Sequence, residues 1–304
     1  MFPSLRSPTI AIITAILTWP QIAATEDRLP ALIIRVPESV TTLFVAETST
    51  AQFHRFDRKG DKLALVGSYY MSIGRGGAGK QRSRDKRTPL GAYFITEQLD
   101  TSKLHTKYGV SAFPLDYPNA WDLRAARDGD GIWVHGVDPA TGRRPKLDTD
   151  GCIALTNEDL SVLAPEFRDN VTPVLITRAV NWVDASHNRA LRIELEDRVN
   201  DWANSRKHGD LHAYLSFYDD EFERWGMNLT EWSSLILQTD SLRPIQEAAV
   251  SDLLLTGYPE EEGVYLSRFQ QKLLEADRQT VITKRLYWRR DASGELKIIA
   301  EDDG

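Results

Sequence analysis

The spacing of apolar residues changes between residues 181 and 190, and this change divides the chain into two parts. Before it, apolar runs are short and separated by turn-forming residues, as at residues 43–46. Short runs of this kind are typical of β-strands. After it, Leu195, Val199 and Trp202 follow the spacing of one helix face. The sequence therefore predicts a mostly-β domain followed by a smaller α+β domain.

The same patterns predict further elements. Strands are expected at residues 32–34, 53–56, 63–70, 93–95, 132–134 and 174–177, and as a pair within 280–299 joined at 291–294. Thr156 can cap a helix, with Asp159 three positions later. One face of a further helix is predicted to contain Leu211, Tyr214, Leu215 and Tyr218.

Residues 1–24 have the pattern of a secretory signal peptide. Arg6 supplies a positive charge, residues 10–19 form a short apolar stretch, and Ala24 offers a small residue at a cleavage point before Thr25. This stretch is too short to span a bilayer as a helix, which needs about 20 residues; an uncleaved anchor is the alternative. No later stretch is long and apolar enough to span, so we expect a soluble mature protein that is periplasmic or otherwise exported.

Charge and motif spacing argue against several classes of ligand. The formal net charge of −7 is opposite in sign to that of a general nucleic-acid-binding protein. The glycine pattern at residues 74–80 resembles nucleotide-binding loops, but no helix-like sequence follows, and Gln81 stands where a magnesium-binding Ser or Thr is required. The six His residues and one Cys lack metal-ligand spacing, and residues 128–131 fit a tight turn better than a calcium loop. We expect no nucleic-acid partner, metal or other cofactor.

A basic loop follows the glycine pattern. Its cations are Lys80, Arg82, Arg84, Lys86 and Arg87. The simplest interpretation is a solvated loop, and the alternative is that these charges attract a carboxylate-bearing polymer.

Cys152 is the one cysteine of the chain and has no disulfide partner within it. In an exported protein such a thiol is either inert and buried or kept for its chemistry. Gly151 lets backbone and substrate approach closely, and His135 ends a predicted strand 17 residues earlier. A returning loop could place the imidazole beside the sulfur as a base. The spacing alone leaves both interpretations open.

Two motifs resemble the YkuD-type L,D-transpeptidase catalytic domain. They are His135-Gly136 at the end of a strand and Thr149-Asp150-Gly151-Cys152 downstream. Residues 88–91 and 113–119 are also similar to that family, and the resemblance covers about residues 40–178. It implies a mostly-β fold and a ping-pong reaction on peptidoglycan stem peptides (muropeptides).

In that reaction the cysteine thiolate attacks the carbonyl between meso-diaminopimelate and D-Ala of a tetrapeptide. D-Ala is released, and the rest of the stem remains bound to the cysteine as an acyl-enzyme. Water then gives a tripeptide (L,D-carboxypeptidase), whereas an amine of a neighbouring stem gives a cross-link (L,D-transpeptidase). By position, the resemblance implies that Cys152 is the nucleophile and His135 the base. It further implies that the Gly136 carbonyl orients the imidazole and that Gly151 and Cys152 offer oxyanion donors. A thiolate-imidazole mechanism predicts loss of activity below about pH 6, where His135 of ordinary pKa is protonated, or at a lower pH if both partners titrate as an ion pair.

Other residues of the matching segments are candidates for substrate binding. They are Thr149, Trp133, Tyr117 and Asn119. Two positions depart from the family pattern, because Asp150 replaces a His and Ala154 replaces an Arg that could bind a substrate carboxylate. Arg124, Arg143 or Arg144 could replace that cation if not simply solvated, and Arg124 is our candidate.

The second part of the chain resembles the nuclear-transport-factor-2-like (NTF2-like) domain carried by cell-shape-determining L,D-carboxypeptidases. The resemblance lies in residues 199–202 and 210–222. It implies a cone with a pocket that could hold wall fragments or a partner, although a structural or dimerising role is the alternative. Trp202, Tyr214 and Tyr218 are expected in its core. The predicted organisation is a signal peptide (residues 1–24), a catalytic domain (residues 25–180) and an NTF2-like domain (residues 190–304).

Three functions remain open from the sequence. The form Gly-Cys-Ile-Ala at residues 151–154 favours a periplasmic L,D-carboxypeptidase that trims tetrapeptide stems and influences cell shape. The alternatives are an L,D-transpeptidase, which forms 3-3 cross-links or attaches protein to the wall, and a catalytically silent wall-binding module. The oligomeric state is not predicted.

Overall fold

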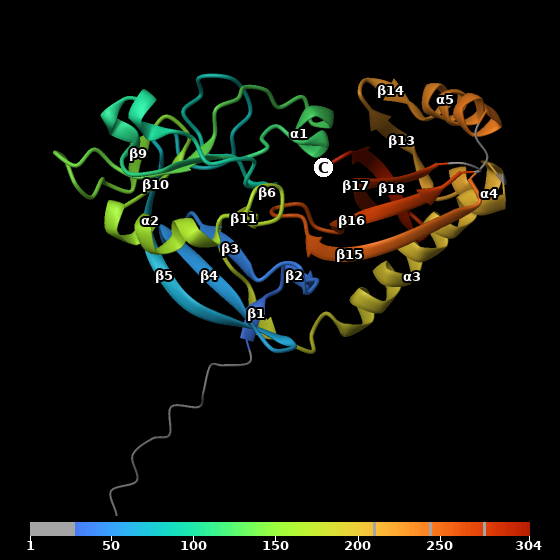
Figure 1. Ribbon diagram of the computed structural model, residues 1–304, viewed down its shortest axis with the longest axis horizontal. Helices are drawn as coiled ribbons and strands as arrows, with labels where there is room; N and C mark the ends of the chain where they lie inside the picture. Colours follow the sequence, from blue (N-terminus) through green and yellow to red (C-terminus); the bar gives the residue numbers. More distant parts are fainter. Residues whose placement is uncertain (1–27, 209–210, 243–244, 276–277) are drawn as a thin grey trace, which may run out of the picture.

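The computed structural model describes residues 28–208, 211–242, 245–275 and 278–304, so the predicted signal segment lies outside the described residues. Two sheets lie side by side, with α3 along one side of the C-terminal sheet (Figure 1). None of the helices in these ranges has the length and apolar character needed to cross a bilayer. The mostly-β architecture with a following α+β part agrees with the prediction from apolar spacing.

Within the described residues, nine strands form the first sheet. In spatial order they are β6 (Gly91–Phe94), β11 (Pro173–Thr177), β3 (Thr42–Glu47), β4 (Gln52–Lys59), β5 (Lys62–Gly74), β10 (Ile153–Leu155), β8 (Trp133–His135) and β7 (Ala112–Pro114), while β9 (Leu147–Thr149) also pairs with β5. The parallel pairing of β10 with β8 places Ala154 opposite His135. This register brings the two motifs of the sequence to one place in the sheet.

Seven described strands form the second sheet. Their order is β14 (Met227–Asn228), β13 (Tyr218–Arg224), β18 (Leu296–Asp302), β17 (Gln279–Arg290), β16 (Val264–Leu274), β15 (Glu247–Gly257) and β2 (Ile33–Arg35). β2 thus comes from the N-terminal side of the chain and pairs with β15. A separate pair joins β1 (Arg28–Pro30) to β12 (Trp182–Asp184). The segment before the catalytic strands is therefore part of the C-terminal sheet.

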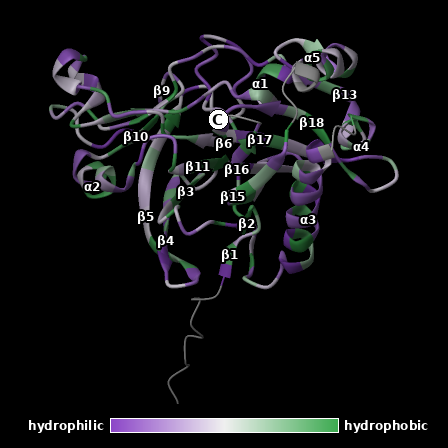
Figure 2. Cartoon of the chain, turned by 45° about the vertical axis from the view of Figure 1, so that its right-hand side comes forward, coloured by the Kyte–Doolittle hydropathy of each residue, from purple (hydrophilic) through white to green (hydrophobic). Residues whose placement is uncertain are grey.

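The two longest helices of the described residues, α3 and α5, lie in the second half of the chain. The helices are α1 (Ala120–Arg124), α2 (Asn157–Leu163), α3 (Arg189–Ser205), α4 (Leu211–Leu215) and α5 (Leu229–Leu242), with 3-10 turns η2 (Thr101–Lys103), η3 (Thr106–Tyr108), η4 (Ala164–Glu166) and η5 (Arg206–His208). Hydrophilic and hydrophobic residues alternate along α3 in Figure 2. Its residues Leu195, Val199 and Trp202 are fully buried against the C-terminal sheet, which confirms the predicted helix face.

The two sheets share an apolar core. Trp121 of α1 packs against Tyr258, with ring centroids 5.4 Å apart, and Tyr258 packs against Tyr287 of β17 at 5.8 Å. Arg285 of β17 forms an ion pair with Asp116 across the same boundary. The N-terminal half is therefore supported by the C-terminal half through both apolar and charged contacts.

The structure confirms strands at the predicted positions, with small shifts of their ends. Thr156 caps α2, because its hydroxyl accepts a hydrogen bond from the N–H of Asp159 at 3.1 Å. The predicted helix face through Tyr218 is wrong at its end, since α4 stops at Leu215 and Tyr218 begins β13. Tyr218 is buried in β13, where its hydroxyl donates to Glu301 of β18 at 2.8 Å.

Candidate active site

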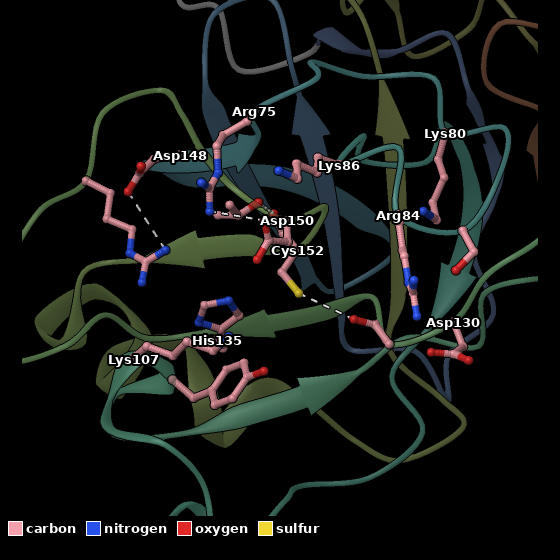
Figure 3. A pocket seen from close by; sticks show the side chains of 15 residues that line it. Arg75, Lys80, Arg84, Lys86, Lys107, Asp130, His135, Asp148, Asp150 and Cys152 are labelled. Atoms are coloured by element: carbon pink, nitrogen blue, oxygen red, sulfur yellow. Dashed lines mark hydrogen bonds and ion pairs between the residues drawn. The ribbon is translucent and has the colours of Figure 1, made fainter.

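A cavity of about 940 Å³ lies where β8 and β10 meet the basic loop. Cys152, His135 and Thr149 line it, as do Tyr108 and Gly131. Figure 3 shows the sulfur and the imidazole next to each other in this cavity. The structure thus brings together the residues that the sequence predicted as nucleophile and base.

His135 ends β8 and is 3% exposed. Its Nδ1 lies 2.6 Å from the carbonyl oxygen of Gly136. Because a carbonyl oxygen only accepts, Nδ1 must carry the ring proton, and Nε2 keeps a lone pair. Side chains on neighbouring strands in register share a face, so the pairing with Ala154 directs the imidazole to the same face as Cys152.

Cys152 directly precedes β10, and its side chain is partly exposed to the cavity. The Sγ atom lies 3.4 Å from the carbonyl oxygen of Gly131, to which the thiol can donate weakly. The sulfur is therefore reachable from the cavity and has a main-chain acceptor while it is protonated.

Burial sets the protonation state of this pair. It lowers the pKa of His135 to about 4, against the opposing contribution of the Gly136 carbonyl and with a smaller contribution from the charges of Arg144 and Lys107. Burial also raises the pKa of the Cys152 thiol, although the main chain of Trp133 and the charge of Lys107 act in the opposite direction. At neutral pH the site is therefore a neutral thiol beside a neutral imidazole. The expected loss of activity near pH 6 moves to a lower pH, because it assumed an imidazole of ordinary pKa.

A tight backbone turn presents the nucleophile. The Thr149 hydroxyl donates to the carbonyl oxygen of Cys152 at 2.7 Å and accepts from the N–H of Gly151 at 3.2 Å. Gly151 has φ +131°, and a Cβ atom there would lie 2.9 Å from the carbonyl oxygen of Arg87. Glycine is therefore required at this position. Thr149 lines the cavity as expected, but its hydroxyl is already committed to the turn.

Asn157 is a functional residue to which the sequence analysis assigned no role. Its Oδ1 accepts from the N–H groups of Val137 (3.0 Å) and Val110 (3.3 Å), and its Nδ2 donates to the carbonyl of Val137 at 2.9 Å. A Cβ atom on Gly136 would lie 2.3 Å from Oδ1. Asn157 thus fixes the backbone that follows His135. Its position five residues after Cys152 was the available signal.

An aromatic layer stands behind the imidazole. Tyr108 meets the edge of His135 at a centroid distance of 5.1 Å, and Trp133 packs on Tyr108 at 4.8 Å. Tyr108 lines the cavity, whereas Trp133 is not among the lining residues found within the described chain. Trp133 therefore supports His135 through Tyr108, and we propose no substrate contact for it.

Three other candidates for substrate binding lie elsewhere. The buried Tyr117 donates its hydroxyl proton to the Asp128 carbonyl at 2.9 Å. Asn119 caps α1 and donates to the Tyr258 hydroxyl at 3.1 Å, and Arg124 donates to the Glu221 carbonyl at 3.3 Å. Asn119 and Arg124 line a separate cavity of about 390 Å³ between α1 and the turn that joins β13 to β14. These residues serve the packing around α1, because each bonds to a partner away from the nucleophile.

The cavity wall is rich in charge. Among the described residues its basic members are Arg75, Lys80, Arg84, Lys86, Lys107 and Arg144, and its acidic members are Asp130, Asp148 and Asp150. The interpretation of the basic loop as simply solvated is wrong for Lys80, which is 4% exposed and lies 3.0 Å from Asp85. Burial would raise the pKa of Asp85, but hydrogen bonds from the loop N–H groups outweigh it and hold that pKa at about 2. The basic loop is therefore held in place by its own ion pair and hydrogen bonds, and it forms part of the cavity wall.

Of the other two arginine candidates, Arg144 lines both the cavity of Cys152 and a neighbouring hollow, and Arg143 lines the hollow alone. Arg144 lines the catalytic cavity with a side chain that is 17% exposed and lies 3.9 Å from Asp148. Arg143 instead places its guanidinium 3.6 Å from the ring centroid of Tyr70 and lines a different hollow. No group of three or more His, Cys, Asp or Glu side chains in the described ranges is arranged to hold a metal ion.

Comparisons with known proteins agree with this geometry. Residues 42–176 match the L,D-transpeptidase catalytic domain (YkuD), and residues 194–302 match the Cds6 C-terminal NTF2-like domain. The solved structure of Bdellovibrio bacteriovorus Bd1075 is similar, with a TM-score of 0.74 and 26% identity over 91% of this chain and 98% of that chain. The helical cell shape determining protein Pgp2 from Campylobacter jejuni has the same fold, with a TM-score of 0.75 and 24% identity over 90% of this chain and 95% of that chain. No curated protein sequence matches significantly.

Proposed function

We propose that this chain, which joins an L,D-transpeptidase-type (YkuD) catalytic domain to a C-terminal NTF2-like domain, is an exported cysteine L,D-carboxypeptidase of peptidoglycan. The observation that carries the proposal is the position of Cys152 and His135 in one solvent-open cavity. The imidazole is held there by the Gly136 carbonyl, with Nε2 available to accept a proton. A thiol and a positioned base are what nucleophilic acyl transfer requires.

The reaction begins with proton transfer from Sγ of Cys152 to Nε2 of His135. The thiolate then adds to the carbonyl carbon between meso-diaminopimelate and D-Ala. As the C–N bond breaks, the imidazolium gives its proton to the departing nitrogen, so D-Ala leaves as a neutral amine and a thioester remains. Water then attacks the thioester while His135 accepts its proton. As the C–S bond breaks, the imidazolium returns this proton to the sulfur, so the tripeptide leaves and the thiol of Cys152 is restored.

The oxyanion needs a main-chain donor close to the sulfur. The N–H of Gly151 is engaged with the Thr149 hydroxyl. We therefore assign the N–H of Cys152 to the developing oxyanion. The turn held by Thr149 keeps that donor next to the reacting carbonyl.

The charge of the cavity favours hydrolysis over transfer. The acceptor of a cross-linking reaction is an amine that is cationic at neutral pH until it loses a proton. Within the described structure the lining holds more basic than acidic side chains, which disfavours a cationic acceptor and leaves water unaffected. The absence of a cation at Ala154, within the same motif, is a second difference from the transpeptidase pattern.

The deciding experiment is incubation of the purified protein with disaccharide tetrapeptide. We expect free D-Ala and disaccharide tripeptide from the wild type and neither from Cys152→Ala. Cross-linked dimers as the main product would instead support the L,D-transpeptidase. No product, together with no labelling of Cys152 by a thiol-directed or carbapenem reagent, would support the silent wall-binding module.

The cellular role follows from the substrate. Trimming stem peptides removes donors for later cross-links, so we propose that the enzyme influences cell shape; the likeness to Pgp2, named as a helical cell shape determining protein, supports this. Such a substrate requires export, which the pattern of residues 1–24 predicts. A mature N-terminus at Thr25, read by N-terminal sequencing of exported protein, would test it.

A further inference from the structure

We infer that Lys107 and Arg144 together form the binding site for the carboxylate of the departing D-amino acid, and so restrict the enzyme to stems with a free C-terminus. This inference rests on the proposed function. It concerns the half of the substrate that leaves, for which neither motif of the sequence provides a cation.

The chemistry fixes where the leaving residue lies. The group that protonates the departing nitrogen is the imidazolium of His135, so this nitrogen must lie on the His135 side of the sulfur. In Figure 3, Lys107 lies beside His135, whereas Arg84, Lys80 and Asp130 lie on the other side of Cys152. The leaving residue therefore faces Lys107, and the acyl part of the stem faces the basic loop.

Lys107 is held at this side by its neighbours. It belongs to η3, and its Nζ lies 4.9 Å from the ring centroid of Tyr108, the residue that packs on His135. The N–H of Lys107 is itself bonded to Nδ1 of His105 at 3.1 Å. The ammonium group of Lys107 thus lies against Tyr108, the ring that also packs on the proposed general base, His135.

Arg144 has the second charge. Its side chain is largely buried in the wall, and 3.9 Å separates it from Asp148, which is long for an ion pair. By comparison, Arg75 and Lys80 each lie 3.0 Å from a carboxylate oxygen, of Asp150 and Asp85 respectively. Arg144 can therefore exchange a loose partner for an incoming carboxylate more readily than those two.

Both cations act on the reacting pair. The charges of Arg144 and Lys107 lower the pKa of His135 and that of Cys152, which places them within electrostatic reach of both groups. Ala154, at the position of the Arg in the transpeptidase pattern, is opposite His135 in register and 2% exposed. The missing cation on β10 is thus replaced by two cations from loops that flank the base.

The test compares two substrates in four substitutions to glutamine, and in Arg144→Lys as the variant that keeps the charge. The substrates are the disaccharide tetrapeptide with a free C-terminal D-Ala and the same compound with C-terminal D-alaninamide. The variants are Lys107→Gln and Arg144→Gln, with Lys103→Gln and Arg143→Gln as matched controls. Lys103 is a largely exposed residue of the neighbouring 3-10 turn, and Arg143 stacks on Tyr70 outside the catalytic cavity.

A charge-assisted hydrogen bond is expected to contribute a factor of about 10 to 100 in kcat/KM. Lys107→Gln and Arg144→Gln should each lose this factor on the free acid and less than about threefold on the amide. The wild type should prefer the acid over the amide by at least the same factor. Arg144→Lys should recover part of the loss, and both controls should behave as the wild type.

Other outcomes overturn the inference. If both substrates lose activity equally in Lys107→Gln and Arg144→Gln, these cations act only through folding or through the protonation of His135. If neither substrate is affected, they bind nothing of the leaving residue. In either of these outcomes, release of D-Ala from the free acid by the wild type leaves the proposed carboxypeptidase function intact. A wild type that releases no D-Ala overturns both the proposed function and the carboxylate-binding site.

Discussion

The side-chain amide of Asn157 is hydrogen-bonded to both main-chain polar groups of Val137, accepting from its N–H at 3.0 Å and donating to its carbonyl at 2.9 Å. Val137 is two residues beyond His135, and Gly136 between them provides the carbonyl that fixes the imidazole tautomer. The first turn of α2 therefore controls the geometry of His135 on β8, the residue that we propose as the general base.

Removing the hydrogen bonds between Asn157 and Val137 should reduce the rate of the chemical step more than it weakens substrate binding. We expect Asn157→Ala to reduce kcat by about 10- to 100-fold with a smaller change in KM, because displacement of a catalytic group by about 1 Å has effects of this size. Asn157→Asp keeps the hydrogen-bond acceptor and loses the donor, so its kcat should lie between that of the wild type and that of Asn157→Ala. Steady-state kinetics on disaccharide tetrapeptide measures this, with Asn204→Ala on the exposed side of α3 as the control. Wild-type kcat in Asn157→Ala would contradict the positioning role.

The pH dependence of kcat/KM should show the buried base. Protonated His135 cannot accept the thiol proton, so activity should fall on the acid side with a midpoint near pH 4, the pKa of His135 in the folded protein. Lys107→Gln should move the midpoint upward, because the Lys107 charge lowers that pKa. His187→Gln, at an exposed position, should leave the midpoint unchanged. A midpoint near 6.5 in the wild type would mean that His135 is solvated or is not the base.

Stability should depend on pH through the same residue. The pKa of His135 is lower in the folded chain than its ordinary value of 6.5, so between pH 6.5 and pH 4 the unfolded chain binds a proton that the folded chain does not. The free energy of unfolding should therefore decrease as the pH falls through this window, by about 2–3 kcal/mol at pH 4.5. Urea unfolding at pH 7 and pH 4.5 measures the change, and His135→Gln should reduce it. Burial also lowers the pKa of His54, which adds a contribution of the same sign.

Contact between the two halves should depend on the ion pair of Arg285 with Asp116. Arg285 is 6% exposed, and its removal leaves the part-buried carboxylates of Asp116 and Asp302 without this cation. We expect Arg285→Met to lower the free energy of unfolding by about 3–5 kcal/mol, the usual effect of breaking a buried pair on one side. Calorimetry should show a lower unfolding temperature than in Arg278→Met, whose side chain is exposed. Equal stability of the two variants would show that apolar packing alone holds the halves together.

Local patterns in the sequence predicted the elements whose signals are local. The short apolar runs became strands, Thr156 became a helix cap, and His135 and Cys152 came to line one cavity. The long strands β15 and β16 were not predicted, because polar residues interrupt their apolar positions and pairing along the C-terminal sheet stabilises them.

Residues around α1 show the limit of motif-based assignment. Asn119 belongs to a segment similar to the catalytic family, yet its side chain bonds to Tyr258, 139 positions later in the chain. Arg124 was chosen for its charge, whereas Lys107 and Arg144 are among the basic residues that line the cavity of Cys152, and Arg124 is not. Long-range packing decides which charged residues face a cavity, and no local pattern contains that information.

The placement of β2 at the edge of the C-terminal sheet has a consequence for the order in which the molecule can assemble. Ile33 is among the first described residues, but its partner Thr256 leaves the ribosome more than 200 residues later. β2 therefore cannot pair with β15 until most of the polypeptide has been synthesised. A shortened protein that ends after the catalytic strands would expose Ile33 and Ile34, so the catalytic half is expected to aggregate when produced by itself.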